Sequence, residues 1–139
     1  MHTAGSNISD GEVLYRYAKP SAFPEGQKEI PTGIFNDPEL SCDWEKYQKS
    51  PEESYHIGEG RSLVFAITVH DSIRNPRNPK GKGEIVKDWC QEIVYNPVTD
   101  EDDPNHGANP SHSLIRGKKR QAVLVALQAN TVLYTKVEI

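Results

Sequence analysis

The sequence predicts an α+β domain with a mixed or mainly antiparallel sheet of about five strands and two or three short helices. Segments in which apolar and polar residues alternate, as in strands, recur along the whole chain. Prolines and glycines interrupt the stretches between them, so the helices must be short. A doubly wound parallel sheet would need regular alternation of strands and helices, which only the last third of the chain offers.

The first half of the chain gives one strand, an irregular loop and two short helices. Residues 12–18 (EVLYRYA) predict a strand, and residues 19–39, with four prolines, predict a long loop held by Phe23, Ile34 and Phe35. A short helix is expected from Asp43, with Trp44 and Tyr47 on the same side. The SPEE motif at residues 50–53 has the form of a capping box, so a second helix is expected there, ended by Gly58 and Gly60.

The second half begins with the strongest strand pattern, SLVFAITVH at residues 62–70, which we place centrally in the sheet. A basic loop (74–84) follows and leads into a segment (84–98) whose β-branched and aromatic residues favour a strand without excluding a helix. After an acidic loop, the chain predicts a strand, a helix and a final strand. These last elements cover residues 111–115, 118–130 and 131–139.

Length and charge favour one cytoplasmic domain. The 139 residues carry a net charge of −4, and we expect a flexible tail at residues 1–11 and a single domain at 12–139. The longest apolar run, from Leu63 to Val69, is far shorter than the ~20 residues of a membrane helix, and the first residues do not resemble a signal peptide. We therefore expect no membrane association.

The two cysteines, Cys42 and Cys90, do not form a C-x-x-C pair and are expected to be reduced. His106 and His112, near Asp102 and Asp103, suggest a divalent-metal site, but no pair of ligands has the spacing of a helical metal motif. A solvated loop is the alternative that we prefer. We predict neither a metal nor a cofactor.

Gly117, Lys118 and Lys119 form a candidate anion-binding site at the start of a predicted helix. A helix N-terminus offers free N–H groups and a positive dipole end, to which the lysines would add charge. The segment lacks the second glycine and the hydroxyl of a phosphate-binding loop. The alternative is a tight turn followed by a solvated basic corner.

His70, His112 and Arg16 form a candidate catalytic group. His70 ends the predicted central strand and His112 begins another, so both side chains have a fixed direction. If the two strands were neighbours, the histidines would converge with Arg16 or Lys118, which suits chemistry on a phosphate-bearing substrate. In the alternative, His70 only caps a strand and Asp71 starts a turn.

The basic loop offers a third candidate site, for a phosphate backbone or an acidic protein surface. Its cations are Arg74, Arg77, Lys80 and Lys82. The acidic balance of the whole chain weighs against a dedicated nucleic-acid binder. A solvated hairpin loop is the simpler interpretation.

Four segments together resemble a family of small uncharacterised bacterial proteins: EVLYRY, TGIFNDPELSCDWEKYQKSPEE, TVHDSIRNP and NPSHSLIRGKK. That family has an early LYR, then F-x-D-x-E-L-S-x-D followed by S/T-P-E, and a late N-P-x-H with G-x-K. The resemblance extends from Leu14 to about Lys119 and implies a bacterial, cytoplasmic protein without implying an activity. Residues 77–107 look like an insertion relative to the family.

The sequence carries no strong catalytic signature, so whether the protein is an enzyme stays open. Its small size, long proline-rich loop and charged segments favour a module that binds another protein. The alternative is an enzyme or binder of a phosphate-bearing substrate, such as a nucleotide or nucleic acid, with a pocket of histidine, arginine and lysine. The oligomeric state is not predicted.

Overall fold

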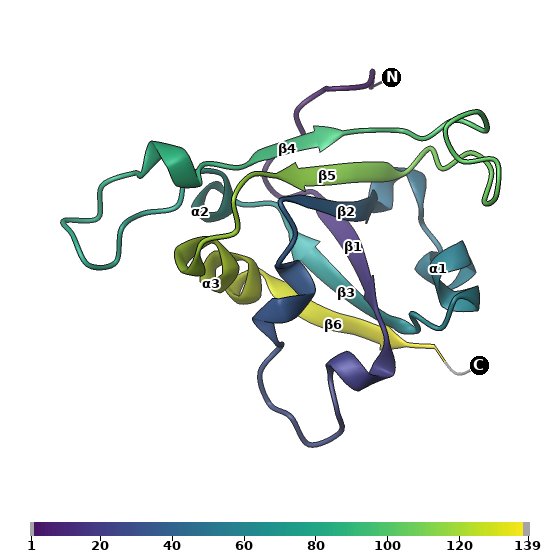
Figure 1. The fold of residues 1–139 in the computed structure, drawn as a ribbon, viewed down its shortest axis with the longest axis horizontal. Helices are drawn as coiled ribbons and strands as arrows, with labels where there is room; N and C mark the ends of the chain where they lie inside the picture. Colours follow the sequence, from purple (N-terminus) through teal and green to yellow (C-terminus); the bar gives the residue numbers. More distant parts are fainter. Residues whose placement is uncertain (1, 138–139) are drawn as a thin grey trace.

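The alternating segment at residues 12–18 forms an inner strand, β1 (Val13–Ala18), of a six-stranded antiparallel sheet. We describe residues 2–137 from a computed structural model of the chain (Figure 1). The order of strands across the sheet is β4-β5-β2-β1-β3-β6. The remaining strands are β2 (Glu39–Trp44), β3 (Leu63–Thr68), β4 (Glu92–Tyr95), β5 (His112–Arg116) and β6 (Thr131–Lys136). The α+β class is confirmed, with one strand more than expected.

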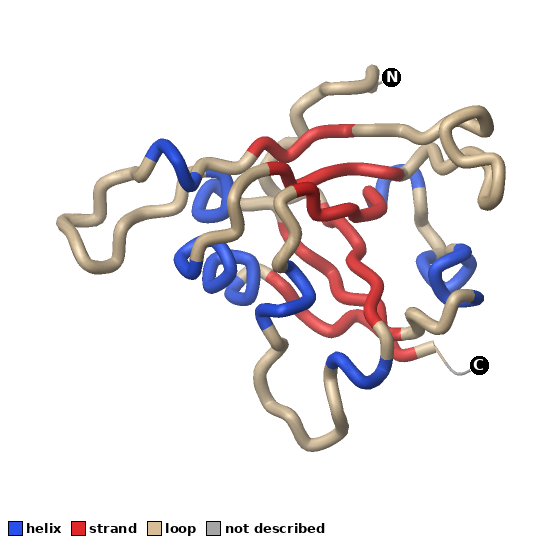
Figure 2. The backbone as a smooth tube through the Cα atoms, in the orientation of Figure 1, coloured by secondary structure: helices blue, strands red, loops and turns tan. Residues whose placement is uncertain are grey.

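Each face of the sheet packs against a different helix, as Figure 2 shows. Leu14 and Ala18 of β1 belong to the main core, together with residues of α3 (Gln121–Ala129). Tyr15 and Tyr17 point to the other face, where a smaller cluster includes Ile57 of α1 (Tyr55–Gly58). The period-2 alternation along β1 thus separates the two clusters.

The predicted strand, helix and strand at the end of the chain are confirmed as β5, α3 and β6. Four antiparallel pairings separate β5 from β6, so the two strands run in the same direction with three strands between them. The connection through α3 therefore crosses one face of the sheet, and Val123, Leu124 and Leu127 are buried against it. Residues 138 and 139 of the predicted last strand lie outside the described residues.

The prediction of a helix from Asp43 is wrong, because Asp43 lies in β2. It is paired with Tyr15 on one side and His112 on the other. Strand pairing on both sides outweighs a local helix pattern. Only a single 3₁₀ turn, Glu45–Tyr47, follows, although the rings of Trp44 and Tyr47 do meet, with centroids 5.4 Å apart.

The predicted capping box does not form. Residues Pro51–Glu53 make one 3₁₀ turn, and the Ser50 side chain makes no capping hydrogen bond. The helix begins later, at Tyr55, where the Ser54 hydroxyl accepts a hydrogen bond from the backbone N–H of His56. The predicted end of this helix is confirmed at Gly58.

The first residues extend the sheet where we expected a flexible tail. The N–H groups of Gly5 and Ile8 donate to the carbonyls of Tyr95 and Ile93 in β4, at 2.8 and 2.9 Å. Ile8 is fully buried in the main core. Backbone pairing with β4 and burial of this one side chain therefore hold residues 2–11 against the domain.

The segment that resembles an insertion supplies part of the core. Of the strand expected at residues 84–98, only β4 is formed, after a 3₁₀ turn at Lys87–Trp89. Ile93 and Tyr95 of β4 are buried. Removing the whole segment would therefore expose the edge of β5 and open the core.

Candidate functional site

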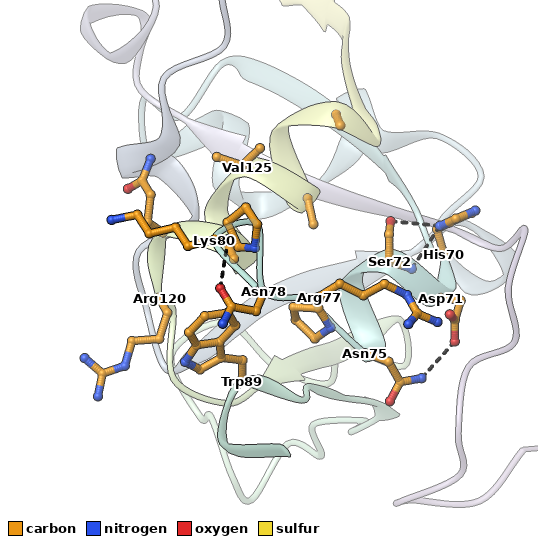
Figure 3. A pocket seen from close by; sticks show the side chains of 16 residues that line it. His70, Asp71, Ser72, Asn75, Arg77, Asn78, Lys80, Trp89, Arg120 and Val125 are labelled. Carbon is orange, nitrogen blue, oxygen red and sulfur yellow. Dashed lines mark hydrogen bonds between the residues drawn. The ribbon is translucent and has the colours of Figure 1, made fainter. Parts of the chain in front are cut away.

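A groove of about 1010 Å³ lies between α3, the basic loop and α2 (Asp71–Arg74) (Figure 3). Helix α3 supplies one wall, and the start of the basic loop supplies the other. The groove is lined by His70, Asp71, Ser72, Asn75, Pro76, Arg77, Asn78, Pro79, Lys80, Trp89, Arg120, Gln121, Ala122, Val125, Ala126 and Ala129. Cavities of this size hold small ligands or anchor side chains of a partner.

The α3 wall is an apolar stripe. Ala122, Val125, Ala126 and Ala129 recur at the i, i+3, i+4, i+7 spacing that places residues on one side of a helix. Val125 is 48% exposed in spite of its apolar side chain. The core side of α3 is also apolar, so this helix has two apolar sides. On the groove side, Ala126 is partly buried against the main core, whereas Val125 and Ala129 are exposed.

Proline and tryptophan side chains form the opposite wall. Trp89 is half-buried at the end of its 3₁₀ turn, and its carbonyl accepts a hydrogen bond of 2.8 Å from the Gln91 side chain. Pro76 and Pro79 complete the apolar surface beside it. A partly exposed tryptophan next to rigid prolines is typical of an anchor point for a partner.

Three cationic side chains line the groove beside its apolar surface. Arg77, Lys80 and Arg120 line the groove and are exposed, whereas Asp71 is its one acidic residue. The Asp71 carboxylate already accepts a hydrogen bond of 2.8 Å from Asn75. In a chain of net charge −4, this is a local cationic surface, which attracts negatively charged ligands.

His70 occupies one end of the groove, where it caps α2. Its Nδ1 accepts a hydrogen bond of 3.0 Å from the backbone N–H of Ser72. The alternative interpretation had His70 capping a strand and Asp71 starting a turn, whereas here His70 caps a helix of one turn that Asp71 begins. In Figure 3, the His70 ring lies beside Ser72, at the end of the groove far from Arg120.

The structure does not bring His70, His112 and Arg16 into one cavity. The imidazole of His112 lies on β5, with Nδ1 2.7 Å from the carbonyl of Asn96 and Nε2 3.3 Å from the Ser41 hydroxyl. Arg16 lines a different, smaller cavity. Two strands, β2 and β1, separate β5 from β3, so the convergence that we expected between neighbouring strands does not occur.

The residues of the predicted anion site bind parts of the protein itself. The Lys119 ammonium donates to the carbonyls of Ile115 and Gly117, both at 2.9 Å, and burial lowers the pKa of Lys119 to about 8. Lys118 is exposed, and its carbonyl accepts from Gln91. Helix α3 begins only at Gln121. Gly117, Lys118 and Lys119 therefore form a basic turn between β5 and α3.

The cations of the basic loop are divided between structural contacts and the groove. Arg74 pairs with Asp10 at 3.2 Å and also donates to the carbonyl of Ile8. Lys82 does not line the groove. Of the four cations of this loop, only Arg77 and Lys80 therefore join Arg120 in lining the groove.

His106 attaches the acidic loop to α1. Its ring nitrogens lie 2.9 Å from Asp103 and 3.1 Å from Glu59, and its ring stacks on Tyr55. The hydrogen bonds to these two carboxylates raise the pKa of His106. No group of side chains that could hold a metal ion is found in residues 2–137.

A buried polar cluster on the α1 side was not predicted from the sequence. Asp43 is 1% exposed, and one of its oxygens accepts a hydrogen bond of 2.9 Å from Asn109. The second oxygen of Asp43, the Tyr17 hydroxyl and Nδ1 of His56 are buried without a hydrogen-bond partner in the described part of the chain. Burial lowers the pKa of His56, whose ring stacks on Tyr17. An aspartate in an apolar strand, between Cys42 and Trp44, was the available signal.

Comparison with known proteins gives no relative: the chain matches no protein-family model, no curated protein and no solved structure. The resemblance to a bacterial family therefore stays a prediction. The chain is also without a helix of the length and apolar character needed to cross a membrane, among the residues described.

Proposed function

We propose that this protein is an interaction module that binds an acidic segment of another protein in the groove between α2 and α3. The observation that carries the proposal is the apolar side of α3, with Val125 and Ala129 exposed, which faces Trp89 and two prolines across the groove. Three exposed cations at the rim specify the charge of the partner. Apolar centres with polar rims are usual for binding surfaces.

The shape of the groove favours a peptide over a small metabolite. Its volume of about 1010 Å³ lies at the upper end of the ~300–1,000 Å³ of small-molecule sites. The apolar stripe follows α3 from Ala122 to Ala129, which suits a chain segment with several anchor side chains. The cations Arg77, Lys80 and Arg120 would attract its carboxylates.

Binding can be measured by calorimetry and by NMR shifts of the α3 amides. The probe is a synthetic peptide in which glutamates flank leucine and phenylalanine, and the control peptide has lysine in place of glutamate. We expect only the acidic peptide to bind, with shifts concentrated on α3 and on the loop that carries Arg77 and Lys80. Val125→Asn and Lys80→Glu should each weaken binding about tenfold.

Matched controls are Val132→Asn and Lys46→Glu, which alter an exposed valine and an exposed lysine outside the groove. Equal losses in the control and groove variants would overturn the proposal. Tighter binding of single-stranded DNA than of the acidic peptide, with the same dependence on Val125 and Lys80, would also overturn it and assign the groove to nucleic acid.

A bacterial and cytoplasmic setting is part of the same proposal. It is supported by the family resemblance and by Cys42 and Cys90, which are unpaired. Fractionation of the host cell tests this setting, since recovery in a secreted fraction would contradict it.

A further inference from the structure

A second cavity, of about 480 Å³, lies at the C-terminal end of β1. It shares no lining residue with the groove. Residues of the loop between β1 and β2 line it, together with Arg61, just before β3. The lining residues are Arg16, Tyr17, Ala18, Lys19, Ser21, Ala22, Pro31, Gly33, Ile34 and Arg61.

The cavity contains three cations and no acidic residue. Arg16, Lys19 and Arg61 line it, and none of them forms an ion pair with a carboxylate among residues 2–137. The chain as a whole is acidic, with a net charge of −4. Uncompensated positive charge at a concave surface concentrates anions.

Arg16 is the central cation because it is half-buried and oriented. Its Nε donates to the carbonyl of Ile34 at 3.0 Å, and its Nη1 donates to the carbonyl of Ser41 at 3.1 Å. These neutral acceptors fix the guanidinium plane but do not neutralise its charge. Burying a charge without a counter-charge is unfavourable, so a bound anion would stabilise this arrangement.

The free donors of the cavity suit an oxyanion. A guanidinium has five N–H groups, of which the two carbonyls use two, so the remaining donors of Arg16 can hold oxygen atoms in a planar fork. Lys19, Arg61 and Ser21, whose side chains also carry hydrogen-bond donors, line the same cavity. This set of donors matches a doubly charged oxyanion.

We propose that this cavity is a binding site for the phosphate group of a small phosphomonoester. The site differs from the groove in position, volume and lining, so it goes beyond the proposed peptide binding. Arg16 belongs both to this cavity and to the phosphate pocket that the sequence predicted. The other cations of the cavity are Lys19 and Arg61, whereas the prediction named His70, His112 and Lys118. The volume leaves room for an organic group beside the phosphate.

Titration with inorganic phosphate tests the site, followed by NMR of the arginine Nε–H signals and by calorimetry. We expect saturable binding with a shift of the Arg16 signal, whereas sodium chloride at equal ionic strength should have no such effect. Arg61→Gln, at an exposed position, and Arg16→Lys should each reduce the affinity about tenfold. Arg77→Gln, in the groove, should leave the affinity unchanged.

Titration with malonate, a dicarboxylate, tests whether the site prefers phosphate to carboxylate groups. Weaker binding of malonate than of phosphate supports the phosphate assignment. Binding of malonate alone, or phosphate affinity that is unchanged by Arg61→Gln and Arg16→Lys, overturns it. Acidic-peptide binding to the groove should persist in both arginine variants, so a failure here is distinguishable from a failure of the proposed function.

Discussion

The side-chain amide of Asn109 donates a hydrogen bond of 2.9 Å to the buried carboxyl group of Asp43. This contact joins the loop after β4 to the middle of the sheet, across 66 positions of sequence. It is the one hydrogen bond found for the Asp43 side chain within residues 2–137, since the second oxygen has no partner. The position of the acidic loop and the stability of β2 are therefore coupled.

Asn109→Ala should lower the free energy of unfolding by about 2 kcal/mol, because it leaves a buried carboxyl oxygen without a donor. The change also removes the acceptor of the Ser111 hydroxyl. Urea denaturation followed by circular dichroism measures the effect. Asn105→Ala, in the exposed part of the same loop, is the matched control and should change stability by less than about 0.5 kcal/mol. Similar losses in both variants would contradict the role of Asn109.

Most of the fold could be predicted because the strand patterns are strong. The strand predicted at residues 62–70 is formed as β3 (Leu63–Thr68), although it lies next to the edge strand β6 and not at the centre of the sheet, and the last three elements appear in the predicted order. The helix expected at Asp43 failed for a physical reason. The polar residues around Asp43 resemble the start of a helix, but pairing with Tyr15 and His112 holds Asp43 in a strand. Such pairing depends on distant segments that local patterns do not contain.

The candidate sites were less predictable because they depend on strand order. The sequence singled out Arg77, Lys80 and Arg16, but the structure assigns them to two separate cavities. His70 and His112 would have met only on adjacent strands, and the order β5-β2-β1-β3 separates them. The sequence predicted a helix over residues 118–130, but nothing in it showed that Val125 and Ala129 would remain exposed beside a groove.

Tyr17→Phe should leave stability unchanged or increase it by up to about 1 kcal/mol. The Tyr17 hydroxyl is buried without a hydrogen-bond partner among the described residues, and burial, followed by the charge of Asp43, raises the pKa of Tyr17. Removing an unsatisfied buried hydroxyl removes a desolvation cost while the ring can still stack on His56. Urea denaturation tests this, and a loss above about 1 kcal/mol would show that the hydroxyl is bonded in solution.

Gly117→Ala should destabilise the protein by about 1–3 kcal/mol. A Cβ atom at this position would lie 2.6 Å from the amide nitrogen of Gln91, and the φ angle of Gly117 is +148°. Gln91 cannot move freely, because its side chain is buried and donates to the carbonyls of Trp89 and Lys118.

A double-mutant cycle separates the two causes of this loss. In the background of Gln91→Ala, the cost of Gly117→Ala should fall, since the clash is removed and only backbone strain remains. An unchanged cost would assign the whole effect to the backbone. A negligible cost in both backgrounds would contradict the close approach of Gly117 and Gln91.

His106 should titrate above the usual value of about 6.5, because both of its ring nitrogens face carboxylates. Protonation favours the contacts with Asp103 and Glu59, so the folded state binds the proton more tightly than the unfolded state. The resulting stabilisation is complete below the unfolded pKa of about 6.5 and is lost as the pH rises through the higher folded pKa.

Imidazole NMR across pH 5 to about 9 measures this titration directly. Glu59→Gln removes one carboxylate and should lower the pKa of His106 toward its usual value, whereas Glu52→Gln, an exposed control, should not. NOEs between the stacked rings of His106 and Tyr55 should weaken as the pH rises, because the acidic loop then loses its charged attachment to α1. A pKa of His106 at or below 6.5, with NOEs independent of pH, would show that the loop is held by backbone contacts alone.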